Sequence, residues 1–195
     1  PCDMFIHRMA QMDLFNFGRK SDMYELVETA APHWSPEMRD YPIFMANRAF
    51  ANEELLYYTE AERYGREAIE LDPGDPWGAH AVAHVMVMQG RIDEGVDWLE
   101  GLSVNWAGKN QIVHHDYWHL CLFLLERGEH DRILEVYDSK VYNLESPLTK
   151  AMPDNVIDVT NAASLLMRLE LRGVDVGDRW QVVAEPAEGR IDNHV

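Results

Sequence analysis

Two pairs of histidines have the residue types and spacing that could support chemistry. The pairs are His80 with His84 and His115 with His119. Within each pair the residues are four positions apart, so in a helix both imidazoles project from one face. The second pair follows the first by 35 residues (115 − 80 = 35 and 119 − 84 = 35). Because neutral imidazole binds zinc, copper, iron and nickel, the four residues are a candidate site for a transition metal such as zinc.

The same spacing is open to two other interpretations. Histidines on a helix often cap carbonyls, hydrogen-bond across a groove or contact a ligand, and they also act as acid–base groups without a metal. A zinc site is demanding because each nitrogen must lie about 2.0–2.1 Å from the ion. Side chains on adjacent helices of a superhelix diverge, so the pattern permits a metal site without requiring one.

Carboxylates and one tryptophan complete the candidate site. Glu53 lies one helical turn beyond position 49, which is one 35-residue repeat before His84, so we expect it to face the same side. Asp116 lies inside the second histidine pair, and Glu53 and Asp116 are the candidates for a general base. Asp158 is a further candidate carboxylate, and Trp118 is a candidate ligand contact.

The positions of glycine and proline predict that the chain is a series of helix pairs. Asp75 can cap a helix whose first position is Pro76, and Gly90 can end it. A short turn is expected at 35–37, irregular chain at 103–110, a connection at 139–151 and a loose tail at 184–195. No segment alternates as a β-strand would. The expected helices span 3–17, 22–31, 41–59, 61–71, 77–89, 92–100, 111–126, 130–137, a helix capped by Asp154 and ending at 171, and 176–183.

The 35-residue offset is close to the length of a tetratricopeptide repeat, which is a helix–turn–helix unit of about 34 residues. Ala61, Ala68 and Pro73 fall at the small, small and proline positions of one such unit. The sequence therefore predicts an all-α, tetratricopeptide-like helix-turn-helix repeat solenoid of about four to five helix pairs, forming a single domain over residues 1–195. In that register His80 and His84 face the concave groove of the solenoid.

Several stretches resemble one tetratricopeptide family in particular, the family named for tetratricopeptide repeat protein 38. The similarity includes both histidine pairs and Gly177-Asp178-Arg179-Trp180. It lies in residues 75–85, Gln89-Gly90-Arg91 with Glu94-Gly95, His115, Trp118-His119-Leu120, Leu125-Glu126-Arg127-Gly128 and residues 165–180, while Asp116-Tyr117 and Met167 depart from the family pattern. Members of this family are longer, so the chain resembles their middle portion, and both of its ends are expected to be cuts in a longer protein. The resemblance implies an all-α solenoid and carries no settled activity.

Composition excludes several classes of partner. The chain has 17 Lys and Arg against 34 Asp and Glu, a formal net charge of −17, and no basic cluster, so neither nucleic acid nor an anionic membrane surface is expected as a partner. No apolar run approaches the roughly 20 residues of a membrane span, and no signal peptide is recognisable. Two cysteines, Cys2 and Cys121, do not make a disulfide framework, so a cytoplasmic location is expected.

Two functions fit these features. The first is a binding scaffold whose histidine-lined concave groove holds a peptide, protein or small-molecule ligand. The second is a metal-assisted or histidine-based hydrolase or lyase that acts on a small molecule in the same groove, with Glu53 or Asp116 as the base. Bound metal and an enclosed pocket would favour the enzyme, whereas an open groove would favour the scaffold, which is the preferred interpretation.

Overall fold

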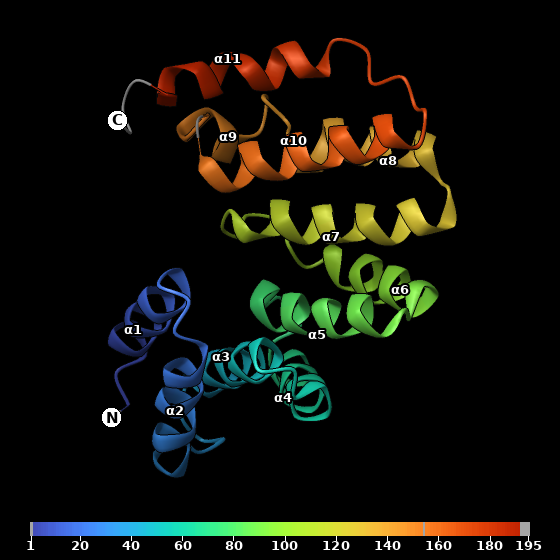
Figure 1. Cartoon of the computed structure of the whole chain (residues 1–195). Helices are drawn as coiled ribbons and strands as arrows, with labels where there is room; N and C mark the ends of the chain where they lie inside the picture. Colours follow the sequence, from blue (N-terminus) through green and yellow to red (C-terminus); the bar gives the residue numbers. More distant parts are fainter. Residues whose placement is uncertain (1, 154, 192–195) are drawn as a thin grey trace. The chain divides into compact units, whose positions relative to one another are not determined.

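The computed structural model describes residues 2–153 and 155–191, and within these ranges every regular element is helical (Figure 1). The predicted all-α fold class is therefore confirmed. Contacts divide the chain into two compact units. Unit 1 comprises Pro1–Arg91 with Glu100–Ala107, and unit 2 comprises Ile92–Leu99 with Gly108–Val195.

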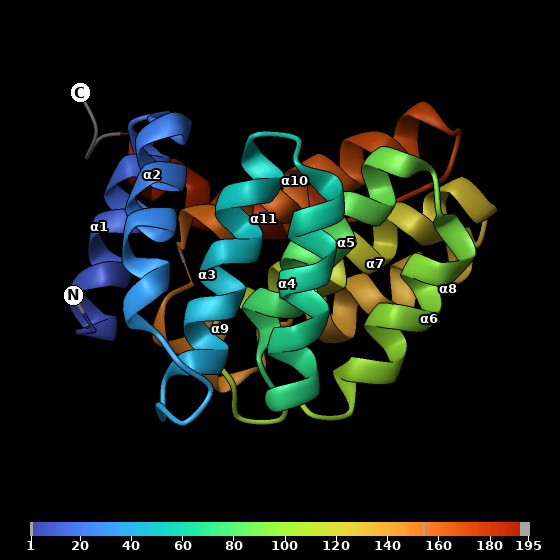
Figure 2. The same cartoon turned by 90° about the horizontal axis from the view of Figure 1, so that it is seen from below.

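Unit 1 consists of helix pairs in which each helix packs on the next. Helices α3, α4 and α5 pack against one another, and α2 packs on both α1 and α3. Figure 2 shows the same neighbours from below, with α1 beside α2 and α4 beside α5. The helices are α1 (Met4–Asn16), α2 (Lys20–Ala30), α3 (Tyr41–Glu54), α4 (Tyr58–Leu71) and α5 (Pro76–Gln89), with a 3₁₀ turn, η1 (Ala31–His33), after α2.

Unit 2 begins with the first part of α6 (Ile92–Ser103), whose last residues belong to unit 1. Its central helix α7 contacts both α8 and α10, and α10 also packs against α11. These elements are α7 (Ile112–Arg127), α8 (His130–Val136), the π turn η2 (Tyr137–Val141), α9 (Pro147–Ala151), α10 (Val156–Leu171) and α11 (Arg179–Ile191).

The predicted stop signals around the histidine helices are confirmed. The Asp75 side chain accepts hydrogen bonds from the backbone N–H groups of Trp77 and Gly78, which caps α5. Gly90 ends α5 with φ 68° and Gly128 ends α7 with φ 72°, a left-handed conformation that glycine adopts without steric cost. The sequence therefore marks both ends of α5 and the C-terminal end of α7.

The predicted boundary between the third and fourth helices was wrong. A helix was expected over 41–59, but α3 ends at Glu54 and α4 starts at Tyr58. The chain turns through Leu56, which has φ 64°, and the N–H of Tyr57 bonds back to the carbonyl of Asn52. A left-handed leucine is uncommon, and no glycine or proline marks the turn, so nothing in the local sequence indicated it.

Three predictions near the C-terminus also need correction. The connection at 139–151 contains the π turn η2 and the short helix α9, which Ser146 caps by accepting from the N–H of Thr149. The last helix runs over Arg179–Ile191 rather than 176–183, so most of the expected loose tail is helical. The cap predicted at Asp154 falls on a residue outside the described ones, and the side chain that caps α10 is Asn155.

Close helix approach behind both histidine helices depends on glycine. A Cβ added to Gly65 in α4 would lie 2.5 Å from Val82 Cγ2 in α5. A Cβ added to Gly95 in α6 would lie 2.3 Å from Phe123 Cζ in α7. Real Cβ atoms do not approach so closely, so a side chain at either glycine would force the neighbouring histidine helix or its side chain to shift.

The two cysteines lie in different environments, and neither forms a disulfide. Cys2 is exposed, and its thiol donates to the carbonyl of His33 at 3.2 Å. Cys121 is buried in α7, and burial raises the pKa of its thiol well above the ordinary range. Among the described residues, no helix has the length and apolar character needed to cross a membrane.

Candidate histidine site

The first histidine pair lies on α5 in unit 1, as its spacing predicted. The rings of His80 and His84 have centroids 4.3 Å apart and meet edge to face, with an interplanar angle of 69°. His80 is buried at 4% exposure, whereas the side chain of His84 keeps 25%. Phe50 and Trp77 contact the ring of His80 at centroid distances of 5.8 and 6.0 Å. The pair therefore has one ring fixed by aromatic packing and one ring nearer the solvent.

Glu53 on α3 lies beside this pair. Its Oε2 atom lies 3.3 Å from His84 Nδ1, and the carboxylate is buried at 5% exposure. The carboxylate therefore lies close to the imidazole, although Oε2 accepts no hydrogen bond from the described residues. A carboxylate at the Nδ1 side of an imidazole favours the tautomer that carries its proton on Nδ1, which leaves a lone pair on Nε2. Glu53 is therefore close enough to influence the tautomer of His84.

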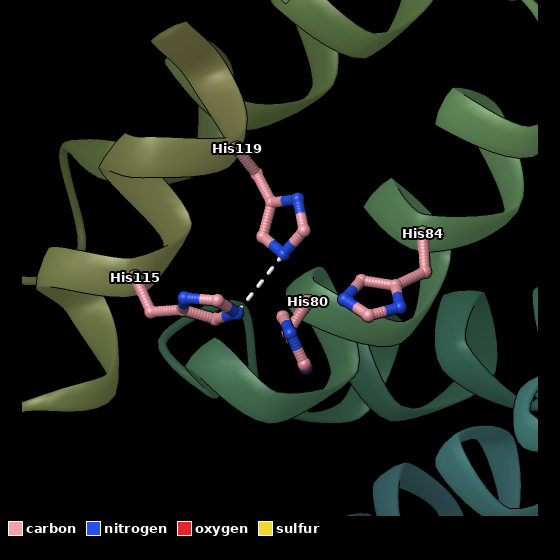
Figure 3. Close-up of side chains that lie close together, drawn as sticks. All are labelled: His80, His84, His115 and His119. Carbon is pink, nitrogen blue, oxygen red and sulfur yellow. Dashed lines mark hydrogen bonds between the residues drawn. The ribbon is translucent and has the colours of Figure 1, made fainter. Parts of the chain in front are cut away.

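The second pair lies on α7 in unit 2 and has nearly the same ring geometry. The centroids of His115 and His119 are 4.6 Å apart with an interplanar angle of 78°. Their Nε2 atoms are 3.1 Å apart, and Figure 3 marks this hydrogen bond with a dashed line. His119 is buried at 4% exposure and His115 is half-buried. Here the buried ring is the second of the pair, whereas on α5 it is the first.

Asn161 and Trp118 fix the ring of His115. The Oδ1 atom of Asn161, on α10, lies 3.0 Å from His115 Nδ1. Since an amide oxygen only accepts, Nδ1 is the nitrogen that donates, and Nε2 keeps the lone pair. Trp118 stacks on the same ring at 5.1 Å with an interplanar angle of 10°. The predicted ligand contact Trp118 therefore supports a histidine ring.

The remaining carboxylate candidates are deeply buried. Asp116 has 0% exposure on α7, which leaves it no solvent-facing surface for accepting a substrate proton. Asp158 on α10 is buried at 1% exposure and is already engaged, because its Oδ2 lies 3.2 Å from His114 Nδ1 and accepts from Gln111 Nε2 at 2.6 Å. His114 and Asp158 thus form a separate pair that ties α7 to α10.

The nitrogen geometry of the second pair suits a tetrahedral metal ion. Two nitrogens that each lie 2.0–2.1 Å from zinc in a tetrahedral shell are roughly 3.3 Å from each other. The observed separation between His115 Nε2 and His119 Nε2 is 3.1 Å. The pair therefore needs only a small adjustment and the loss of one shared proton to offer two lone pairs to one ion.

Sequence reasoning missed two residues that matter here. Asn161 lies one turn after Asp158 on α10, and this shared face could have indicated it. Arg8 on α1 has its guanidinium carbon 3.6 Å from the centre of the Trp77 ring. Arg8 is distant in sequence from the histidines, so no spacing rule connects it to them.

Comparison with known proteins addresses the fold. No known family model matches the chain. The chain is similar to the crystal structure of a putative kinesin light chain of Podosopora anserina with nearly identical TPR-like repeats, at 12% identity and a TM-score of 0.60, covering 98% of this chain and 94% of that one.

Two structures of MamA are similar to the same degree. MamA from residue 41 to its end, from Desulfovibrio magneticus RS-1, is 11% identical with a TM-score of 0.58, and the alignment covers 100% of this chain and 99% of that one. Another MamA crystal structure is 13% identical with a TM-score of 0.59, covering 93% of this chain and 96% of that one. At such identities the likeness concerns the fold. The chain therefore has the tetratricopeptide-like helical-repeat fold.

Proposed function

We propose that the chain is a tetratricopeptide-like scaffold that binds a ligand or partner at a histidine-lined concave groove. We also propose that one transition-metal ion, with zinc the first choice, is held there by His80, His84, His115 and His119. The observation that carries the proposal is the arrangement of the second pair, whose Nε2 atoms lie 3.1 Å apart while Asn161 holds Nδ1 of His115. Metal-binding histidines are usually held in this way at the other ring nitrogen.

The first pair supports the proposal independently. It repeats the four-residue spacing and the edge-to-face ring geometry, and it has its own acceptor, Glu53, beside Nδ1 of His84. Residues 35 positions apart occupy equivalent places in successive repeats. Each pair supplies half of a four-coordinate shell, so the proposed centre needs both.

The donor set also favours binding over catalysis. Four protein ligands close a tetrahedral zinc shell, whereas catalytic zinc keeps an open position for water or substrate. The second candidate function, a metal-assisted or histidine-based hydrolase or lyase acting on a small molecule, is favoured by the 25% exposure of the His84 side chain, because an exposed ligand is the one a substrate can displace. In that second function, three histidines would hold the ion, and the coordination position of His84 would be open to water or substrate.

Elemental analysis and zinc titration of tag-free protein test the proposal. We expect one zinc per chain, lost in the double variant His84→Ala, His119→Ala. The control is His130→Ala, which removes a histidine on α8 that belongs to neither pair. Two zinc ions per chain, no zinc, or unchanged zinc in the double variant would each rule out a joint centre. Hydrolysis of model esters that appears only with zinc would favour the second candidate.

A further inference from the structure

Arg8 in unit 1 has a charged side chain, and no carboxylate among the described residues is hydrogen-bonded to it. Its side chain is half-buried on α1, and no carboxylate among the described residues lies within ion-pair distance of it. Burial lowers the pKa of its guanidinium to about 10, which shows how strongly the surroundings disfavour the charge. A half-buried cation without a carboxylate within ion-pair distance is costly, so its presence calls for an explanation.

The acid nearest to Arg8 is occupied elsewhere. Asp75 lies close enough to favour the charge of Arg8, but its two carboxylate oxygens accept from the N–H groups of Trp77 and Gly78 as the cap of α5. Burial raises the pKa of the Asp75 carboxyl, which weakens it further as a counter-charge. The cap and the guanidinium therefore compensate each other only in part.

The guanidinium is nevertheless held in a defined orientation. Its flat face stacks on Trp77 at 3.6 Å, and Nη1 donates to Oδ1 of the buried Asn47 on α3. The other terminal nitrogen, Nη2, is buried and has no hydrogen-bond partner among the described residues. An oriented guanidinium with an unused N–H edge is the arrangement that arginine uses to bind a planar oxyanion.

We propose that Arg8, stacked on Trp77 and held by Asn47, is the carboxylate-binding residue of a ligand site in unit 1, and that its ligand is a small organic carboxylate. The net charge of −17 favours a monoanion, since long-range repulsion rises with the charge of the ligand. Trp77 and His80 are one turn apart on α5, with ring centroids 6.0 Å apart. A ligand held by its carboxylate at Arg8 therefore extends along α5 towards the first histidine pair.

NMR titration tests this site, with the indole N–H of Trp77 as the reporter and sodium acetate as the probe at constant ionic strength. We expect a saturable shift in the wild type that weakens at least about tenfold in Arg8→Gln, because a hydrogen-bonded charge pair is lost. Arg63→Gln is the matched control, since Arg63 is an exposed arginine that stacks on Tyr64 at 3.9 Å. That variant should bind acetate as the wild type does.

Further variants and probes decide the remaining outcomes. Should Arg8→Gln fail to fold, Arg8→Lys keeps the charge and removes the fork, and the same loss is expected. The absence of a saturable shift in the wild type, or equal binding by the Arg8 variants, would overturn the proposal. Tighter binding of inorganic phosphate than of acetate would overturn the carboxylate assignment. None of the four histidines binds the anion in this proposal. Loss of acetate binding therefore bears on the Arg8 site alone, and loss of zinc binding bears on the histidine site alone.

Discussion

The two histidine pairs share one ring geometry but differ in what holds them. On α5 a buried carboxylate, Glu53, lies 3.3 Å from Nδ1 of His84. On α7 a neutral amide, Asn161, lies 3.0 Å from Nδ1 of His115 in a hydrogen bond. The carboxylate contributes charge, which strengthens a metal-bound imidazole as a donor, whereas the amide contributes direction alone. The comparison shows that one histidine pair has a charged neighbour, whereas the other is held by a neutral hydrogen-bond acceptor.

The largest expected effect comes from deleting either pair. His80→Ala with His84→Ala, and His115→Ala with His119→Ala, should each weaken zinc binding at least about a thousandfold, because half of the ligands of a structural zinc site are removed. Competition with a coloured chelator measures both affinities. One double variant that binds as the wild type does would break the comparison, since it would make one pair sufficient alone.

The next effect on zinc affinity separates the contribution of the Glu53 charge from that of the Asn161 hydrogen bond. Glu53→Gln should weaken zinc binding by about 10–100-fold, because the charge beside His84 is lost while the shape is kept. Asn161→Ala should weaken it by a similar factor, and Asn161→Asp should strengthen it, since a charge is added at the same Nδ1. The same chelator competition measures all three variants. Equal affinity of Asn161→Asp and the wild type would contradict an electrostatic role for the acceptor.

A third effect concerns the packing behind each pair. Gly65→Ala and Gly95→Ala should each lower the free energy of unfolding by about 1–3 kcal/mol, because the added methyl meets Val82 or Phe123 well inside contact distance. Gly101→Ala on α6 is the control, as its Cβ meets nothing within 4 Å. It should raise stability by up to about 1 kcal/mol through helix propensity. Urea denaturation reports all three, and a stable Gly95→Ala would show that α7 can shift.

The smallest effect concerns His7, which is buried at 5% exposure. It is as buried as His80 and His119, which have 4% exposure, but it belongs to neither histidine pair. Burial, and then the charge of Arg8, lowers the pKa of His7. The unfolded chain therefore takes up a proton first, and stability should fall as pH drops below about 6.5.

Substituting His7 isolates this contribution. In His7→Gln the free energy of unfolding should depend less steeply on pH than in the wild type. The slopes should differ by at most about 1.4 kcal/mol per pH unit, which is the limit for one proton. Urea denaturation between pH 5 and pH 8, compared with the wild type, measures the difference. A difference of the opposite sign would mean that His7 is charged in the folded state.

The sequence predicted the parts of this structure that local rules determine. Asp75, Gly90 and Gly128 marked the ends of the histidine helices correctly, because caps and left-handed glycines act within a few residues. The turn at Leu56 escaped prediction because tertiary packing holds a leucine in a conformation it disfavours. The spacing of the histidines was visible, but their supports were not. Asn161 lies 46 residues from His115 in the chain, so only the folded structure brings them together.

The burial of Cys121 has a practical consequence for chemistry on this protein. Thiol reagents and oxidants attack the thiolate, and a buried thiol with a raised pKa offers almost none of it. Cys2, which is exposed, is left as the reactive thiol of the two in the sequence. The folded chain is therefore expected to behave towards maleimides as a single-thiol protein, and a fluorophore or spin label can be attached just before α1 without any cysteine being engineered.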